Sequence, residues 1–433
     1  MTKQAKFQTP SGMHDILPED QPIYQKIYNT AAHVAEFYGF QRIDTPIIED
    51  AELFSKGVGL TTDIVEKQMY TFKSKGGDYL ALRPEFTAAI SRSYIEHGMF
   101  NLSQPVKLYT SGPLFRYERP QFGRFRQFHQ IDLESFGEKS PAIDTQIIQI
   151  FHNILKELKF KNLVIEVNSI GDSQCRPYYK KLLTNYLKAR ESSLCSDCRR
   201  RLRENPLRVL DCKEEKCQPV KAHAPQIIDH LCDECKVHFK QVLEFLDEAE
   251  LPYRLNPYLV RGLDYYTKTV FEIFEDTEQG KALGALAGGG RFDALVKILS
   301  GKDVPATGAA AGVERIVQVL KERQKKSFDA SQGKEPSQIK VFLAQLGELA
   351  KRKSLRLSEE FRKAKIPIAE SLGKDSLKTQ LRSADKIGAV YALILGQKEA
   401  LEGTIIIRDM RSGKQDIVKI EKVIAEMQKR LEK

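Results

Sequence analysis

The stretch KLYTSGPLFRYERPQFGRFRQFHQIDLESFG, residues 107–137, indicates the fold more strongly than any other part of the chain. Two runs rich in apolar and aromatic residues flank RPQFG at 119–123, which contains proline and glycine. This pattern predicts two strands joined by a turn, and therefore a long antiparallel hairpin. Because side chains alternate between the faces of a strand, we expect Gln130, Asp132 and Glu134 on one face.

The charged residues of this hairpin have two explanations. Arg116 and Glu118 lie at the end of the first strand, and Arg124 and Arg126 lie near the turn. Arginines at one end and carboxylates deeper in the sheet would suit a nucleotide phosphate and a cation, respectively. A hairpin with its charges facing water explains the same pattern, and for the hairpin taken alone it is the simpler explanation.

The rest of the chain divides by composition. Up to residue 324, predicted helices and strands alternate, except that residues 172–235 hold all seven cysteines and little strand periodicity. We expect that segment to be a mostly helical insertion. The polar segment 325–338, with Gly, Pro and Ser, predicts a linker. Alternating β and α patterns after it predict a compact α/β domain at 339–433 with a mostly parallel or mixed sheet.

Composition favours a globular protein that works in water. The chain has 433 residues, 41% of them hydrophobic, and a mean hydropathy of -0.40. It contains no apolar run of about 18 residues, the length that a transmembrane helix needs. The first residues lack the apolar segment of a secretory signal, so we expect a cytoplasmic protein without a membrane partner.

Positive charge is concentrated near the C-terminus. Residues 334–433 hold 22 Lys and Arg against 14 Asp and Glu, so they carry +8 of the total net charge of +10. A basic domain of this kind suggests a polyanionic partner. A solvated, lysine-rich surface explains the charge equally well.

The cysteines include two CxxC pairs, Cys195 with Cys198 and Cys232 with Cys235. Four thiolates in paired CxxC spacing can form a tetrahedral zinc site. The two pairs are separated by more than the usual spacer of about 15–20 residues. We therefore expect reduced free thiols rather than a structural zinc ion, with Cys175, Cys212 and Cys217 as the other three thiols.

A second informative stretch is LVRGLDYYTKTVFEI at 259–273, whose apolar ends are typical of a buried strand. Between those ends lie Arg261, Asp264, Tyr265 and Tyr266. A core strand gains nothing from these groups, because each buried polar group needs a partner. We therefore expect them to line a pocket for a small, polar, charged ligand.

Three shorter motifs are ambiguous when each is taken alone. In LRPEFT, Thr87 can act as a helix N-cap and Glu85 can favour the helix dipole. Three glycines at 288–290 predict either a tight turn or a close approach of the backbone to a ligand. In GVERI, Gly312 and Arg315 lie at a predicted helix start, where an arginine can face a phosphate.

Together and in this order, these motifs resemble those of class II aminoacyl-tRNA synthetases. GFQRIDTPIIED (39–50) resembles the first motif, which forms the dimer interface, and 112–137 resembles the second. AAAGVERIVQVL (309–320) resembles the third. Within that class, RGLDYY, TPSGMHDILP, LRPEFT and LAGGGRFDALV are similar to segments of the histidyl-tRNA synthetases, and the resemblance covers essentially the whole chain.

The resemblance implies an α+β catalytic domain built on an antiparallel sheet, spanning 1–324 with the helical insertion at 172–235. It also implies that the α/β domain at 339–433 binds the anticodon. The implied activity joins L-histidine to ATP, supplied with Mg²⁺, to give histidyl-adenylate and pyrophosphate. Histidine then passes to the 3′ end of tRNA(His). The family resemblance further implies a homodimer.

Roles for individual residues follow from the same resemblance. The implied catalytic residues are Arg116 and Arg261 at the α-phosphate and Arg315 at the γ-phosphate. Arg261 would also contact the substrate carboxylate, doing work that many relatives give to a metal. Glu118 and Gly312 would complete the ATP site. The histidine site would comprise Glu85, Thr87 and Gln130 at the α-ammonium group, Glu134 and Tyr266 at the ring nitrogens, and Tyr265 and Phe86.

Two positions depart from the family pattern. Phe86 stands where a glycine is common, which affects the shape of the loop around the ammonium group. Phe122 replaces a smaller or basic residue in the hairpin turn that approaches the tRNA acceptor end. Neither departure removes a side chain that the resemblance makes catalytic.

Three other functions are compatible with parts of the sequence. A regulatory subunit that binds histidine without charging tRNA would lose signature residues and the C-terminal domain, whereas Arg116, Arg261 and Arg315 are all present here. A class II synthetase for another amino acid does not explain RGLDYY together with Gln130 and Glu134. An RNA-binding protein without this activity explains the basic C-terminus but not three phosphate-facing arginines.

Overall fold

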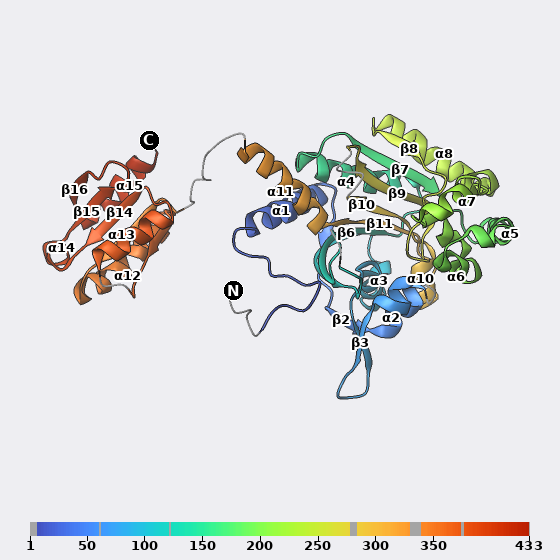
Figure 1. The fold of residues 1–433 in the computed structure, drawn as a ribbon, viewed down its shortest axis with the longest axis horizontal. Helices are drawn as coiled ribbons and strands as arrows, with labels where there is room; N and C mark the ends of the chain where they lie inside the picture. Colours follow the sequence, from blue (N-terminus) through green and yellow to red (C-terminus); the bar gives the residue numbers. More distant parts are fainter. Residues whose placement is uncertain are drawn as a thin grey trace. The chain divides into compact units, whose positions relative to one another are not determined.

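The computed structural model describes residues 7–59, 62–120, 123–277, 284–329, 339–373 and 376–432. It divides into two compact units, Met1–Lys325 and Lys326–Lys433, each described here by itself (Figure 1). Within the described residues, no helix combines the length and the apolar character that crossing a membrane requires.

The first unit is built on an eight-stranded sheet of order β1-β5-β6-β11-β10-β9-β7-β8. Most neighbouring strands are antiparallel; β1 on β5 and β7 on β8 are the parallel pairs among the described residues. The strands are β1 (Gln41–Arg42), β5 (Val106–Phe115), β6 (Gln127–Phe136), β7 (Leu163–Ser169), β8 (Tyr253–Leu255), β9 (Thr267–Glu275), β10 (Ala287–Arg291) and β11 (Ala306–Gly312). A small sheet holds β2 (Ile48–Asp50), β4 (Tyr79–Leu82) and β3 (Tyr70–Lys73).

The helices of this unit cover both faces of the large sheet (Figure 1). They are α1 (Gln21–Phe37), α2 (Ala51–Val58), α3 (Thr87–Glu96), α4 (Pro141–Glu157), α5 (Arg176–Lys188), α6 (Ser196–Glu204), α7 (Gln218–Ala222), α8 (Asp233–Glu248), α10 (Ala294–Ser300) and α11 (Val313–Asp329). Because α11 continues to Asp329, residues 325–329 are helical rather than part of a linker, and 330–338 lie outside the described residues.

The predicted hairpin is confirmed. Strands β5 and β6 pair in antiparallel register from Val106 opposite Phe136 to Phe115 opposite Gln127. The predicted alternation also holds, because Ile131 and Leu133 point into a core formed with α1, α4 and α8. The side chains between them therefore face the opposite side of the sheet, where the ligand-binding residues gather.

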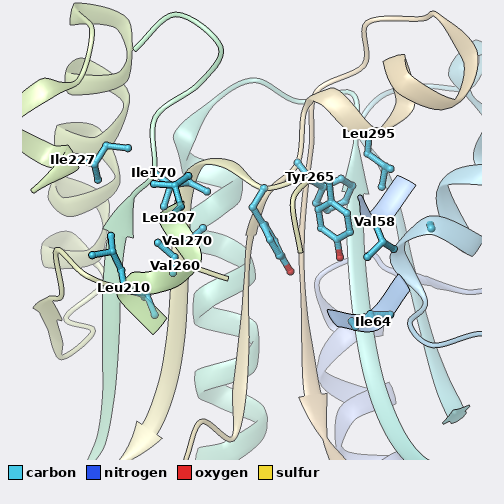
Figure 2. Packing of buried hydrophobic residues seen from close by; sticks show 14 of the residues in the cluster. Val58, Ile64, Ile170, Leu207, Leu210, Ile227, Val260, Tyr265, Val270 and Leu295 are labelled. Atoms are coloured by element: carbon cyan, nitrogen blue, oxygen red, sulfur yellow. The ribbon is translucent and has the colours of Figure 1, made fainter. Parts of the chain in front are cut away.

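The second core joins the sheet to the insertion. It contains residues of α2, α3 and α10 together with residues of the segment 172–235, which is helical as predicted and contains no strand. Figure 2 shows Leu207 and Leu210 of the insertion near Ile170 and Val260, in the same cluster as Tyr265. The insertion is thus packed onto the unit that carries the site.

Two local features differ from the simplest expectation. Of the two possibilities for the glycines 288–290, the tight turn is not found: they lie inside β10, where neighbouring groups leave no room for side chains. A Cβ on Gly289 would lie 2.1 Å from the Gly308 carbonyl oxygen. Residues 259–266 are not strand, since β9 begins at Thr267. A loop lets consecutive side chains face one pocket, whereas a strand would alternate them.

The second unit is an α/β domain with a mixed sheet, as predicted. Its strand order is β13-β12-β14-β15-β16, with β13, β12 and β14 parallel and the last two strands antiparallel. The strands are β12 (Val341–Gln345), β13 (Ile368–Glu370), β14 (Tyr391–Leu395), β15 (Thr404–Asp409) and β16 (Gln415–Lys419). The helices are α12 (Glu348–Lys363), α13 (Leu377–Lys386), α14 (Gln397–Glu402) and α15 (Val423–Leu431).

Candidate active site

A cavity of about 520 Å³ lies against the large sheet in the first unit. Its volume falls in the range of about 300–1,000 Å³ that is usual for small-molecule sites. Arg116, Arg261 and Arg315, which are far apart in the sequence, all line it. The other lining residues predicted from the sequence are Glu118, Gln130 and Gly312.

Among the described residues, the contacts that hold each arginine leave some of its N–H donors without a partner. Arg116 Nε donates to the Pro84 carbonyl oxygen at 2.9 Å, and its guanidinium lies 5.1 Å from the centre of the Phe128 ring. Arg315 Nη1 donates to the Ala285 carbonyl oxygen at 2.7 Å. Since a guanidinium has five N–H donors, each of these two side chains can still bind an anion in the cavity.

Arg261 is the most confined of the three. It forms an ion pair with Glu272 of β9, and its guanidinium lies over the backbone of Gly288. A Cβ at that glycine would come within 2.6 Å of Arg261 Nη1, so any other residue would displace the arginine. The glycine run therefore makes space for a protein side chain that faces the cavity.

In the third motif, at the start of α11, Glu314 binds the sheet and Arg315 faces the cavity. Both carboxylate oxygens of Glu314 accept from the His129 backbone N–H, at 2.9 and 3.0 Å, which ties α11 to β6. Arg315, the next residue, is left to face the cavity. The backbone at Gly312 is open, since a Cβ there would meet nothing closer than Arg315 Cδ at 4.0 Å. A ligand can approach the chain closely at this point.

Next to the cavity lie three buried carboxyl groups, those of Glu85, Asp132 and Glu134. Thr87 Oγ1 donates to Glu134 Oε1 at 2.5 Å, which connects α3 to β6. Glu85 Oε1 accepts from the Ala88 backbone N–H at 2.8 Å. Of the two roles open to Thr87, the helix cap is not found: Glu85 accepts the backbone bond at the start of α3, and the Thr87 hydroxyl is directed to Glu134.

Among the described residues no cation forms an ion pair with these acids, although Arg116 and Arg83 lie near enough to offset part of the effect of burial on Asp132. Burial raises the pKa of all three carboxyl groups, and the charge of a neighbouring acid raises the pKa of Asp132 and Glu134 further. Glu134 Oε2 and Asp132 Oδ1 are buried and have no hydrogen-bond partner among the described residues. Buried acceptors without donors are costly, so this cluster is suited to a ligand that brings positive charge and N–H groups.

The two tyrosines close the same cluster. Their rings lie 4.7 Å apart between centres, and Tyr265 Oη lies 3.4 Å from Glu85 Oε2. Burial, with Glu134 nearby, raises the pKa of Tyr266 to about 12, so its phenol stays protonated at neutral pH. Tyr266 can therefore donate a hydrogen bond as well as accept one.

Backbone packing fixes the position of Glu134. Gly308 of β11 lies opposite it in the sheet, and a Cβ there would fall 1.6 Å from Glu134 Oε2. Only glycine leaves room for the carboxylate. This requirement comes from the pairing of two strands and has no counterpart in the local sequence.

Phe86 lies in the core rather than in the cavity wall. Its side chain is fully buried and packs against the guanidinium of Arg83, whose carbon lies 4.4 Å from the ring centre. Arg83 in turn donates to carbonyl oxygens of Thr45 and Pro113. Phe122, the other position that departs from the family pattern, lies outside the described residues.

Two site residues, Asp132 and Glu272, had no role implied by the family resemblance. Asp132 alternates with Gln130 and Glu134 along β6, and that spacing was sufficient to find it. Glu272 lies within β9 and pairs with Arg261 of the preceding loop. Only the path of that loop, residues 259–266, brings the two side chains together.

The cysteines are arranged differently from the prediction. Cys195 and Cys198 do not share a site with Cys232 and Cys235. The first pair lies with Cys212 and Cys217, and the second pair lies with Asp172 and Cys175. None of the seven cysteines forms a disulfide. The CxxC spacing identified each half-site, but the fold supplied a different partner for each pair.

Comparison with known proteins agrees with this architecture. The family profile described as histidyl-tRNA synthetase matches residues 12–316, and the profile described as anticodon binding domain matches 340–430. A histidine–tRNA ligase from Dehalococcoides mccartyi is 44% identical over 98% of this chain and 100% of its own length. One from Halothermothrix orenii is 44% identical over 97% and 98%, respectively.

Solved structures give the same result. The crystal structure of apo histidyl-tRNA synthetase from S. aureus is 32% identical, with a TM-score of 0.77 over 97% of this chain and 99% of that one. A Bacillus halodurans structure titled ATP phosphoribosyltransferase regulatory subunit/histidyl-tRNA synthetase is 18% identical, with a TM-score of 0.64 over 91% and 99%. At that identity the likeness concerns the fold alone. The predicted fold class is confirmed.

Proposed function

Because the chain belongs to the histidyl-tRNA synthetase family, we propose that its cavity and the adjoining acid cluster are the ATP and histidine sites of one active centre. The chain is a ligase that activates histidine with ATP and then transfers it to tRNA. The observation that carries the residue assignment is the convergence of Arg116, Arg261 and Arg315 on one cavity beside an unpaired buried acceptor.

In the ATP subsite, Arg116 and Arg261 bind the α-phosphate and Arg315 binds the γ-phosphate. The histidine carboxylate attacks the α-phosphorus in line with the departing pyrophosphate. Negative charge spreads over the phosphate oxygens in the transition state, so fixed guanidinium groups directed at them lower the barrier. No protein nucleophile takes part. Glu272 holds Arg261 in place until substrate carboxylate and phosphate compete for its donors.

ATP brings Mg²⁺ as its counterion. In the described part of the cavity the carboxylates of Glu118 and Glu272 are available near the phosphates, but both have arginine partners. Among the described residues, the groups of three or more candidate metal ligands are the two cysteine-containing groups, and neither includes Glu118 or Glu272. We therefore propose that Mg²⁺ is held mainly by the phosphate oxygens of ATP. The arginines neutralise the charge of the α-phosphate.

In the histidine subsite, Glu85, Thr87 and Gln130 hold the α-ammonium group, which supplies the charge that the acid cluster lacks. Glu134 accepts from one ring nitrogen and Tyr266 contacts the other, while Tyr265 packs beside the ring. Phe86 acts through the shape of the loop, since its side chain lies in the core. Bonds at both ring nitrogens reject apolar analogues by about 10⁴-fold, because a wrong side chain leaves buried groups unpaired.

The remaining partners follow from the same assignment. The ribose hydroxyl at the 3′ end of tRNA(His) attacks the activated carbonyl, and the basic C-terminal domain binds the anticodon region. The first motif forms a homodimer interface, which is supported by the exposure of Ile47 (43%) and Ile48 (47%) beside β2. As a translation enzyme, the dimer acts in the cytoplasm.

The test is ATP–pyrophosphate exchange by purified protein with each of the twenty amino acids. Exchange should depend on histidine alone. Arg261→Ala should lower it by about 3–4 kcal/mol of transition-state stabilisation, or roughly 100- to 1,000-fold. Arg254→Ala, which removes an exposed arginine outside the cavity, is the matched control. Histidine binding without exchange would instead support a regulatory subunit.

A further inference from the structure

Four cysteines of the insertion gather beside the active site although they come from separate segments. Cys195 precedes α6, and Cys198 lies in its first turn. Cys212 follows the 3₁₀ turn Pro206–Asp211, and Cys217 ends the 3₁₀ turn Glu215–Cys217, directly before α7. Their four Sγ atoms all lie within 4.8 Å of one another, and all but Cys195 are buried. We call these four residues the cysteine cluster.

The spacing of the sulfur atoms fits a metal better than a disulfide. Cys195 Sγ and Cys212 Sγ lie 3.9 Å apart. A disulfide would require about 2.05 Å. A tetrahedral site with Zn–S bonds of about 2.3 Å places its sulfur atoms about 3.8 Å apart. The observed separation therefore matches the edge of a zinc tetrahedron.

The backbone is arranged to stabilise thiolates. The Cys198 backbone N–H donates to Cys195 Sγ at 3.4 Å, and the Cys195 backbone N–H donates to Cys217 Sγ at 3.2 Å. Cys195 also lies at the N-terminus of α6, where the helix dipole favours negative charge. Thiolates rather than thiols bind metals, so these donors prepare the ligands. Thiols that only fill a core have no need of them.

We propose that the cysteine cluster binds one Zn²⁺ and that this ion fixes the segment 195–217 as a wall of the active-site cavity. Four sulfur ligands in a closed tetrahedron are typical of a structural zinc site. The free-thiol expectation from the sequence rested on the wrong partners. With Cys212 and Cys217 as the other ligands, the two halves of the site are separated only by residues 199–211, a shorter spacer than that between the two CxxC motifs.

The segment packs its apolar side chains into the second core but has little regular secondary structure to fix its backbone. It contains one helix of 9 residues and short 3₁₀ turns, and no strand. It nevertheless presents Arg201 and Arg208 to Asp63 of the catalytic core, at 3.3 and 2.7 Å. Both arginines line the cavity, as do Cys195 and Cys212. Zinc at the cysteine cluster therefore sets the position of one cavity wall.

The second group, Asp172 with Cys175, Cys232 and Cys235, serves as a contrast. Its carboxylate is already engaged, because Asp172 Oδ1 accepts from the Gln174 and Cys175 backbone N–H groups at 2.9 and 3.4 Å. These bonds explain Asp172 as a helix-capping residue at the start of α5. Cys175 Sγ also accepts from the Asp172 backbone N–H at 3.3 Å, so backbone donors alone do not separate the two groups. We assign metal to the cysteine cluster because all four of its ligands are sulfur and none is a helix-capping carboxylate, and we use the second group as a control.

Zinc content decides the assignment. Full-length protein is purified under reducing conditions with added zinc, desalted, and analysed for metal and for thiols. The double variant Cys212→Ser/Cys217→Ser should hold one zinc equivalent less than wild type, whereas Cys232→Ser/Cys235→Ser should still hold the equivalent assigned to the cluster. Zinc-free wild type, equal zinc in wild type and the first variant, or iron in place of zinc would overturn the proposal.

Two measurements on wild-type protein test the proposal even if the variants fail to fold. Titration with an organic mercurial should release the zinc into a colorimetric chelator as the cluster thiols react. Trypsin should then cut faster within Cys198–Leu202, where Arg199, Arg200 and Arg201 are consecutive. Unchanged cleavage after zinc release would contradict the role in fixing the segment. None of these readouts uses catalysis, so their failure would leave the proposed reaction intact.

Discussion

Replacing Glu134 with glutamine tests the histidine subsite at a single atom. Glu134 Oε1 accepts from Thr87, whereas Oε2 has no hydrogen-bond partner among the described residues. Glutamine keeps the size of the side chain and the bond from Thr87. It places an NH₂ group, which only donates, at the position of Oε2. A ring N–H of histidine would then face a donor instead of an acceptor.

The expected loss follows from the energy of that bond. A hydrogen bond to a charged group contributes about 1.5–3 kcal/mol, and an unpaired buried donor adds a further penalty of similar size. We take a total of about 3 kcal/mol. Since about 1.4 kcal/mol corresponds to a factor of ten, kcat/KM for histidine should fall by about 100-fold. Stability should not fall, because the change removes a buried carboxyl group whose pKa is raised.

Pyrophosphate exchange measured against histidine at saturating ATP, and against ATP at saturating histidine, provides the assay. The loss should appear in the histidine series, with KM for ATP close to wild type. Glu166→Gln makes the same chemical change on β7, outside the cavity, and should alter neither. Wild-type kcat/KM for histidine in Glu134→Gln would refute the ring-nitrogen assignment, and a loss confined to ATP would move Glu134 to the other subsite.

Three further outcomes are expected. Gly308→Ala puts a Cβ 1.6 Å from Glu134 Oε2 and must displace the carboxylate, at a cost of about 1–3 kcal/mol. KM for histidine should therefore rise about tenfold or more, and an unchanged KM would contradict the packing argument. Arg291→Ala removes the arginine partner of the fully buried Asp144, which keeps the Thr269 hydroxyl, and should cost about 3–5 kcal/mol in urea unfolding. The exposed Arg254→Ala should cost less than about 1 kcal/mol, and similar losses would refute the distinction. Because burial raises the pKa of Asp132, the folded state keeps a proton that the unfolded chain releases above about pH 4, so stability is lost as pH rises. Asp132→Asn should therefore stabilise the free protein more at about pH 7 than at about pH 4.5, and an equal effect at both would count against the raised pKa.

Part of the site was accessible from residue spacing alone. Alternation along 127–136 put Gln130, Asp132 and Glu134 on one face, and the structure places the first at the cavity and the other two in the acid cluster. That prediction succeeds because the period of a strand is a local property of the backbone. The mixed sheet of the C-terminal unit was predictable for the same reason.

Other features depended on which distant segments meet. Local sequence allowed Thr87 to be a plain helix cap, yet its hydroxyl bonds to Glu134, which lies in a strand 47 positions away. The spacing allowed the two CxxC motifs to form one site together, although free thiols were favoured, yet each motif lies with partners elsewhere in the insertion. Neither outcome follows from short-range spacing, because contacts between segments depend on the path of the whole chain.

The sequence by itself determined the order of the motifs, the hairpin, the alternation of its side chains and the family. The tertiary structure decided which arginines share a cavity, why Gly288 and Gly308 have no side chains, and how the cysteines are grouped. The physical reason is one of range. Periodicity and turn chemistry act over a few residues, whereas steric exclusion and charge pairing act between segments that only the packed fold brings within a few ångströms.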